Sequence, residues 1–233
     1  MSALAAMIAH GGKRILIVVP GKGKEPLKAS WQGAADSYNI TMKPAVGSSA
    51  SDEGVFHVSY DDLYVKGKGG KAVLDADGRP VLNPEFMHGW DVVTFDESHN
   101  MANPGSLMGQ AGIRLQDHAK KAMYLSATPF TNIADVHYMR KMGWFKTGQE
   151  FVEWAGKAGA RVRKGAGEGD IPNKVDNPKS PVPMVTFAAM MHVTGAGIKR
   201  QPYLKGMENA FHKVDSTTMA QEHRDAFDVG DQI

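Results

Sequence analysis

The sequence predicts an α/β fold built on a mainly parallel β-sheet that is flanked by helices. Over the first 145 residues, short apolar runs typical of buried strands alternate with longer amphipathic stretches, which is the pattern of a parallel sheet with helical connections. Two of the apolar runs also end directly in polar motifs, at the edge where parallel sheets bind ligands. From residue 156 to 183 the chain is rich in Gly, Pro, Lys and Asn, which predicts an irregular carboxyl-terminal extension.

The individual elements follow from hydrophobic periodicity and from turn-forming residues. Strands are expected at residues 14–19, 55–58, 91–95 and 121–125. Helices are expected at residues 24–37, 106–120, 133–142 and 149–158, and residues 2–8 are interpreted as the end of a core helix. Residues 66–84 contain many Gly, Lys and Asp residues, and they are expected to form an exposed hairpin or loop. The sequence is thus divided into one domain over residues 1–145 and a linker or accessory extension over residues 146–233.

The composition excludes several classes of protein. At 233 residues and 42% hydrophobic content the chain can bury a core, and its net charge of +2 neither requires nor excludes nucleic acid. The absence of cysteine excludes a disulfide framework, a thiolate zinc site and a cysteine nucleophile. No apolar run approaches the roughly 20 residues that span a bilayer, so a soluble, cytoplasmic protein without a membrane partner is expected.

An acidic motif, Asp96-Glu97-Ser98-His99, follows the predicted strand at residues 91–95. A nucleotide hydrolase needs one carboxylate to hold Mg²⁺ through water and a second to orient or deprotonate the attacking water. At the carboxyl end of a parallel strand, both carboxylates would point into the crevice where such sheets bind ligands. The motif therefore indicates a magnesium–nucleotide site, although these four residues alone would also fit a solvated turn.

A hydroxyl motif, Ser126-Ala127-Thr128, follows the next strand and is closed by Pro129. Small hydroxyl side chains at this position can hydrogen-bond the acidic motif and transmit the state of the nucleotide to a neighbouring element. Alone, this triplet is common in turns and helix caps. The order of strand, acidic motif, helix, strand and hydroxyl motif is much rarer, and it favours a nucleotide hydrolase.

In this order the two motifs resemble the first RecA-like lobe of superfamily-two helicases, with residues 96–99 as the DExH box and 126–128 as motif III. Ile17-Val-Val-Pro20 followed by Ser30-Trp31-Gln32 resembles motif Ia, notably that of Swi/Snf-type remodellers, and Val58-Ser59-Tyr60-Asp61 resembles motif Ib. Residues 125–130 and 138–145 are most similar to strawberry-notch-like helicases, including the helicase-methylase proteins of phages and plasmids. The resemblance covers about residues 3–145.

The resemblance implies ATP and Mg²⁺ as cofactors, DNA in preference to RNA as partner, and a bacterial or phage-infected cell as location. Asp96 and Glu97 would be the catalytic residues, and Asp96 would hold Mg²⁺ through water. The residues expected to couple hydrolysis to motion are His99, Ser126, Ala127 and Thr128. Those expected to face the nucleic-acid backbone are Pro20, Gly21, Lys22, Ser59 and Tyr60. For His99, the alternative is an ordinary polar residue that caps the next helix, and for Trp31 core packing is favoured over stacking on bases.

No GxxxxGK[ST] phosphate-binding loop occurs in the sequence. Gly21-Lys22-Gly23-Lys24 is followed by Glu25 in place of Ser or Thr, and it follows the wrong strand. We therefore expect the chain to begin just downstream of that loop and to need the loop and a second RecA-like lobe as partners. On its own it is expected to be inactive as an ATPase. The alternative is a non-catalytic structural or binding module that retains the lobe, for example in a phage.

Overall fold

A parallel β-sheet forms the centre of the computed structural model, which describes residues 3–9, 12–21, 25–126, 133–162 and 175–176. The strands follow one another across the sheet as β2 (Met42–Pro44), β3 (Gly54–Ser59), β1 (Arg14–Val19), β4 (Trp90–Phe95) and β5 (Ala119–Tyr124). Each neighbouring pair is parallel. The α/β prediction is confirmed, and the four predicted strands are present. The fifth, β2, has only three residues and ends in proline, so it is too short to show a period in the sequence.

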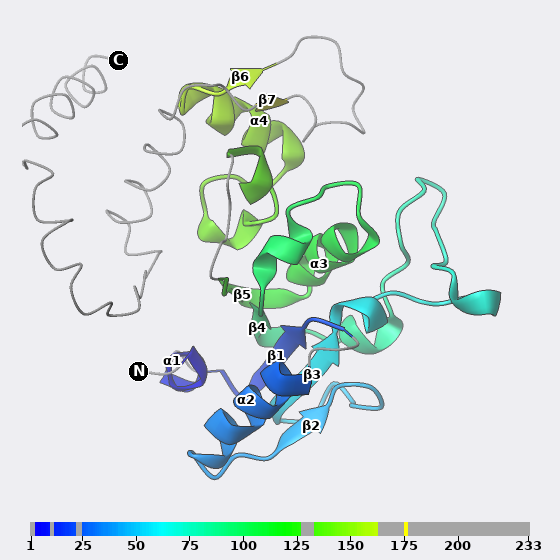
Figure 1. Ribbon diagram of the computed structural model, residues 1–233, viewed down its shortest axis with the longest axis vertical. Coiled ribbons are helices and arrows are strands. Elements are labelled where there is room, and N and C mark those ends of the chain that lie inside the picture. Colours follow the sequence, from blue (N-terminus) through cyan, green and yellow to red (C-terminus); the bar gives the residue numbers. More distant parts are fainter. Residues whose placement is uncertain (1–2, 10–11, 22–24, 127–132, 163–174, 177–233) are drawn as a thin grey trace, which may run out of the picture. The chain divides into compact units, whose positions relative to one another are not determined.

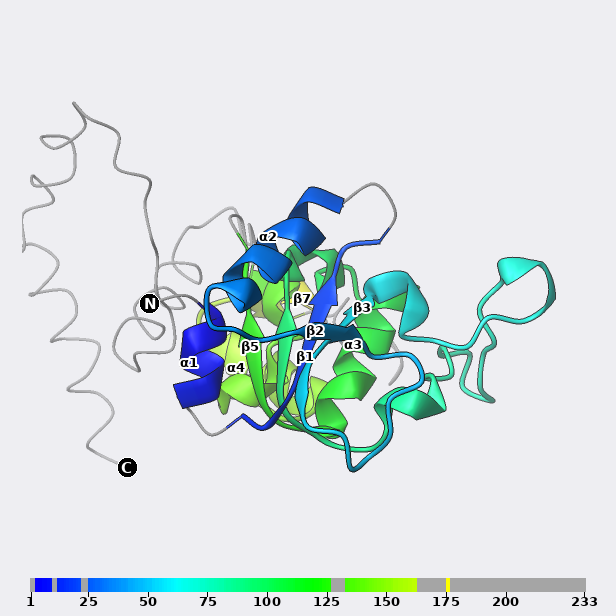
Figure 2. The ribbon, with the colours of Figure 1, turned by 90° about the horizontal axis from the view of Figure 1, so that it is seen from below.

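Helices cover both faces of the sheet (Figures 1 and 2). All six residues of β1 are buried, and successive side chains of a strand point to opposite faces. On one face, Ile15, Ile17 and Val19 pack with α1 (Ala3–Ala9) and α2 (Glu25–Asp36). On the other face, Leu16 and Val18 belong to the same buried cluster as residues of α3 (Leu107–Asp117) and α4 (Gly148–Lys157). The continuous apolar run of β1 is therefore explained by burial on both sides.

Side-chain caps set the beginnings of the two helices on the second face. Ser106 accepts a hydrogen bond from the Gly109 amide over 3.0 Å at the start of α3. Thr147 accepts one from the Glu150 amide over 3.1 Å at the start of α4. Each cap satisfies one of the backbone donors that the first turn of a helix leaves unpaired.

The helix predicted at residues 133–142 is wrong for most of its length. The structure has two 3₁₀ turns there, η5 (Ile133–Val136) and η6 (Arg140–Met142). Between them, Met139 has non-helical backbone angles, and the Tyr138 carbonyl accepts a hydrogen bond from the Gln116 side chain over 2.9 Å. Because that carbonyl is bonded to α3, the tertiary contact replaces a helical bond at the point where the pattern alone predicted continuity.

The core continues beyond residue 145. Phe151, Val152 and Ala155 of α4 belong to the same buried cluster as Phe145. The chain divides into two compact units, residues 1–196 and 197–233, and the second lies wholly outside the described residues. A short antiparallel pair, β6 (Arg161–Val162) and β7 (Val175–Asp176), follows α4. The division between a lobe at 1–145 and an accessory extension stays a prediction.

Residues 64–82 leave the sheet as an excursion that we call the arm, and both views show it projecting from the sheet (Figures 1 and 2). Three segments of the arm are joined in a closed ring of backbone hydrogen bonds. Val65 donates to Val81, Val81 donates to Val73, and Val73 donates back to Val65, over 2.8–2.9 Å. This agrees with the exposed hairpin or loop predicted for residues 66–84. None of the described helices combines the length and apolarity that crossing a membrane requires.

Candidate functional site

Three strand ends meet at the acidic motif, because β4 lies between β1 and β5 in the sheet. The Asp96 amide donates to the Val18 carbonyl over 2.9 Å, which extends the pairing with β1. The Ser98 amide donates to the Leu125 carbonyl over 2.8 Å, which extends the pairing with β5. The residues after β1, beginning with Pro20, and Ser126 after β5 are therefore held on either side of the motif, at the carboxyl edge where parallel sheets bind ligands.

Asp96 is half-buried, and both of its carboxylate oxygens accept hydrogen bonds. Oδ1 accepts from the Glu97 amide over 3.0 Å, and Oδ2 accepts from the indole Nε1 of Trp31 over 2.7 Å. Trp31 lies on α2 and is 9% exposed. Each carboxylate oxygen has two lone pairs, so one remains on each oxygen for water around a metal ion. The two donors fix the rotation of the carboxylate before any ligand is bound.

Glu97 has a left-handed backbone, with φ 49° and ψ 51°, at the residue before η4 (Ser98–Met101). Non-glycine residues adopt this conformation at a cost of about 1 kcal/mol or more, and it persists where surrounding contacts hold it. Here the Asn100 side chain donates to the Glu97 carbonyl over 2.8 Å, and Ser98 is fully buried. This turn directs the Glu97 carboxylate toward His99 instead of along the strand.

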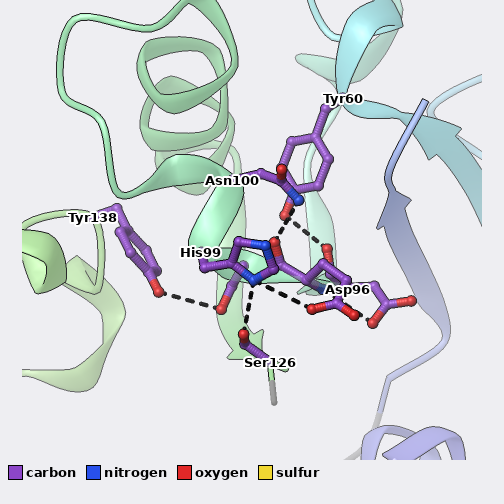
Figure 3. A network of polar contacts seen from close by, with 8 residues as sticks. Tyr60, Asp96, His99, Asn100, Ser126 and Tyr138 are labelled. Atoms are coloured by element: carbon purple, nitrogen blue, oxygen red, sulfur yellow. Dashed lines mark hydrogen bonds and ion pairs between the residues drawn. The ribbon is translucent and has the colours of Figure 1, made fainter. Parts of the chain in front are cut away.

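His99 joins the acidic motif to the hydroxyl motif (Figure 3). Its Nδ1 lies 3.3 Å from Glu97 Oε2 and 2.9 Å from Ser126 Oγ. The same nitrogen therefore contacts a carboxylate oxygen and a hydroxyl oxygen. The structure therefore brings four predicted site residues together at two strand ends: Asp96, Glu97, His99 and Ser126. Ala127 and Thr128 lie outside the described residues.

Two buried tyrosines form hydrogen bonds with residues of the acidic motif. The Tyr60 hydroxyl donates to the Asp96 carbonyl over 3.0 Å. A hydrogen bond of 3.3 Å joins the hydroxyl groups of Tyr138 and Ser98 (Figure 3). Burial raises the pKa of Tyr60 well above its ordinary value and that of Tyr138 to about 12, so both hydroxyls stay protonated at neutral pH. Tyr60 is 0% exposed, so its side chain lies in the core and not on the surface that a contact with nucleic acid requires.

Three of the other residues predicted to face nucleic acid lie around η1 (Tyr60–Asp62). A Cβ at Gly21 would overlap the carboxylate of Asp61, so the absence of a side chain lets the chain after β1 approach this turn. The Ser59 hydroxyl donates to Asp62 Oδ2 over 2.6 Å. Pro20, Gly21 and Ser59 thus border one turn at the carboxyl edge, whereas Lys22 lies outside the described residues.

The side chains present suit a magnesium–nucleotide complex better than a metal held by protein alone. Mg²⁺ is bound in such sites by one or two carboxylates, by waters and by the phosphates of the substrate. Asp96 and Glu97 supply hard oxygen ligands of this kind. Within the described residues, no three His, Cys, Asp or Glu side chains converge on one metal position. The phosphate groups would therefore have to provide much of the coordination.

A hollow of about 750 Å³ lies at the opposite edge of the sheet, where the strands begin. One of its charged groups, Asp91, holds the starts of neighbouring strands together. Asp91 accepts from the backbone amides of Lys13 and Arg14 over 3.0 and 2.9 Å and from Lys120 Nζ over 2.8 Å. The hydrogen bond from Lys120, ahead of those from the amides, holds the pKa of Asp91 below its ordinary value. We place the functional site at the carboxyl edge, because the predicted motifs meet there.

The sequence alone does not identify Trp31 as a residue that contacts the acidic motif. The signal is its place in Ser30-Trp31-Gln32, which resembles motif Ia, but an aromatic residue on an amphipathic helix predicts core packing equally well. Its indole is buried as expected. The polar end of the ring, however, reaches the carboxylate of Asp96, 65 residues away along the chain.

Comparison with known proteins gives a family match and likenesses to solved structures. Residues 29–171 match the family model described as P-loop containing NTP hydrolase pore-1. Among solved structures, the SWI2/SNF2 ATPase core of Sulfolobus solfataricus in complex with dsDNA matches with a TM-score of 0.48 and 15% identity. The match covers 87% of this chain and 36% of that chain, so this chain spans about a third of its length. None of the curated proteins compared matches the sequence.

Proposed function

We propose that this chain, which belongs to the P-loop containing NTP hydrolase pore-1 family, forms the Mg²⁺–ATP side of a nucleic-acid-dependent ATPase. Its five-stranded parallel sheet with flanking helices is a RecA-like α/β fold. The observation that carries the proposal is the link from Glu97 through His99 to Ser126, which joins the acidic motif after β4 to the hydroxyl motif after β5.

In this proposal Asp96 and Glu97 have separate tasks. Bound Mg²⁺ would neutralise the phosphate charge that develops during transfer. Asp96, whose carboxylate is fixed by Trp31 and by the Glu97 amide, would hold the waters around the ion. Glu97 would accept a proton from the attacking water. Its carboxylate contacts His99 and is half-buried, so the group is oriented and still reachable by water.

His99 and Ser126 would couple the nucleotide site to the neighbouring strand end. A change in the protonation or position of Glu97 alters the contact at His99 Nδ1, and this nitrogen also contacts Ser126 Oγ. Such a shared atom makes the two contacts interdependent. Thr128 and Ala127, which belong to the same motif, would transmit the change farther, while Pro20, Gly21, Lys22 and Ser59 would face the nucleic-acid backbone.

We assign the chain to superfamily two, close to strawberry-notch-like helicases, on the motifs at residues 96–99 and 126–128. The sequence has no GxxxxGK[ST] motif, which supplies backbone amides and a lysine to the phosphates. We propose that this loop and a second RecA-like lobe come from another segment or another chain. Without them this polypeptide would not hydrolyse ATP. The same missing motif favours a second candidate, a scaffold module that keeps the lobe without catalysis.

Nucleotide binding and turnover test this proposal. We would measure the thermal midpoint and ATP hydrolysis with Mg²⁺ for the chain alone and for a joined protein, in which the chain is combined with segments that carry the phosphate-binding loop and a second RecA-like lobe. The chain alone is expected to show neither stabilisation nor turnover. The joined protein should be stabilised by nucleotide, because a ligand that binds only the folded state raises its stability. Stabilisation without turnover, or no stabilisation, would favour the scaffold.

A variant pair assigns the chemistry to Glu97. In the joined protein, Glu97→Gln should lower the turnover about 100-fold or more, because it removes the proton acceptor, and should leave nucleotide binding intact. Glu53→Gln is the matched control, since Glu53 is exposed and lies at the opposite edge of the sheet. Unchanged turnover in Glu97→Gln would exclude the role given to Glu97.

A further inference from the structure

We propose that the tip of the arm, residues 66–71, is a second contact for the phosphate backbone of nucleic acid, in addition to the residues around η1. The inference rests on the proposed function. It concerns a segment to which neither the motifs nor the family match assigns a role, and it commits to nucleic acid as the partner. Four features of the arm support it: its charge, its rigid base, its open backbone and its connection to Ser59.

The charge of the tip is wholly positive. Lys66, Lys68 and Lys71 lie within six residues, and no acidic residue occurs between positions 63 and 74. All three lysines are exposed. Lys66 pairs with Asp62 over 3.0 Å, whereas Lys68 and Lys71 form no ion pair within the described part of the chain. Two cations that have no acidic partner at a projecting tip are suited to neutralise phosphates.

The base of the arm is fixed, so the tip is presented in a defined place. The valine ring ties its three segments together, as described above. Arg114 of α3 then holds the second turn of the arm. Its Nη1 lies 2.7 Å from Asp75 Oδ2 and 2.9 Å from the Pro80 carbonyl. Asp75 of the acidic turn is therefore bound to the body of the protein, whereas Lys68 and Lys71 of the basic turn are exposed and have no ion pair among the described residues.

The backbone of the tip is open to close approach. Gly69 and Gly70 have φ values of +76° and +73°, which non-glycine residues rarely adopt. A Cβ placed on either residue would meet no atom within 4 Å. The Gly70 amide donates to the Gly67 carbonyl over 3.1 Å and holds the turn, and the open space beside the two glycines leaves room for a phosphate to reach the flanking lysines.

The arm is connected to the predicted nucleic-acid residue Ser59 through one carboxylate. Asp62 accepts from the Ser59 hydroxyl at Oδ2 over 2.6 Å and from Lys66 Nζ at Oδ1 over 3.0 Å. Asp62 is thereby neutralised by the first lysine of the tip. A backbone that contacts Ser59 would meet Lys66 next, so the arm extends the proposed contact surface and does not form a separate one.

The test measures binding of a fluorescent DNA duplex to the full chain by anisotropy, at several salt concentrations from about 50 to 200 mM. We compare wild type with Lys68→Gln/Lys71→Gln. Each lysine contact releases about 0.9 counterions, so the variant should reduce the slope of log K against log salt by about 1.8. At the lowest salt its affinity should fall on the order of tenfold. Lys68→Arg/Lys71→Arg should keep both the slope and the affinity close to those of wild type, because it keeps the charge.

The matched control is Lys13→Gln/Lys120→Gln, which removes the same charge at the opposite edge of the sheet and should change the slope little. Thermal melts verify that all variants are folded. If wild type binds DNA and the arm variant binds with equal affinity and slope, the inference is wrong while the proposed function stands, and an acidic protein surface becomes the partner class to examine. An equal loss in the control also overturns the inference. If wild type does not bind, the nucleic-acid function itself fails.

Discussion

The indole of Trp31 donates a hydrogen bond to Asp96 across 2.7 Å, and this bond joins helix α2 to the acidic motif after β4. The bond is charge-assisted, because the acceptor is a carboxylate, and such bonds are stronger than neutral ones. It also gives a partner to the indole N–H, which would otherwise be an unpaired donor in a largely apolar environment. The position of α2 is thereby coupled to the orientation of the proposed metal ligand.

A double-mutant cycle measures this coupling. Trp31→Phe keeps a ring in the core and removes the donor, while Asp96→Ala removes the acceptor. We expect an interaction free energy of about 1–2 kcal/mol from urea unfolding of wild type, both single variants and the double variant. A coupling near zero would mean that the indole serves packing alone.

The sequence predicts the residues of the carboxyl-edge site better than the buried residues that hydrogen-bond them, Trp31 and Tyr60. Apolar runs that end in Asp96 and Ser126 place these residues at neighbouring strand tips, because parallel strands end at one edge. His99 follows from the same motif. The contact of Trp31 with Asp96 depends on how α2 lies over the sheet, which hydrophobic periodicity does not specify. Tyr60 shows the same limit, since its burial depends on the direction in which η1 turns after β3.

His137 makes the stability dependent on pH. It is 4% exposed, its Nδ1 contacts the Ala134 carbonyl over 3.1 Å, and its Nε2 has no hydrogen-bond partner among the residues that the structure describes. Burial, above all other influences, lowers its pKa to about 4. The unfolded state, with a pKa of about 6.5, binds the proton first, so stability should fall as the pH drops from about 6.5 to about 4.

The expected loss over this range is roughly 3 kcal/mol, and His137→Phe should abolish it. Urea unfolding at pH 7, 6, 5 and 4.5 gives the comparison. The carboxylates of Asp52, Asp75 and Asp91 have lowered pKa values, so most of their stabilisation is lost below about pH 4, outside the measured range. A variant that loses as much stability as wild type would show that other groups cause the dependence.

Two helical glycines should respond oppositely to alanine. In α3, a Cβ at Gly109 would lie 2.6 Å from the Asn103 carbonyl, which belongs to the backbone and has little room to move. Gly109→Ala should therefore destabilise the protein by about 1–3 kcal/mol. In α2, a Cβ at Gly33 would meet no atom within 4 Å, and Gly33→Ala should stabilise by about 0.5–1 kcal/mol. Urea unfolding of the two variants measures whether the steric contact of the added Cβ or the higher helix propensity of alanine determines the change in stability.

The left-handed backbone of Glu97 predicts that the proposed catalytic base is placed at the expense of stability. Glu97→Asn and Glu97→Gln both remove the carboxylate and its contact with His99, so they differ chiefly in backbone preference. Asn tolerates the left-handed region and Gln does not, and Glu97→Asn should be more stable by about 0.5–1 kcal/mol. Urea unfolding measures the difference, and both variants should lack turnover in the joined protein. Equal stabilities would show that the turn carries no strain, in which case the position of the carboxylate is set by the contacts of Asn100 and His99 alone.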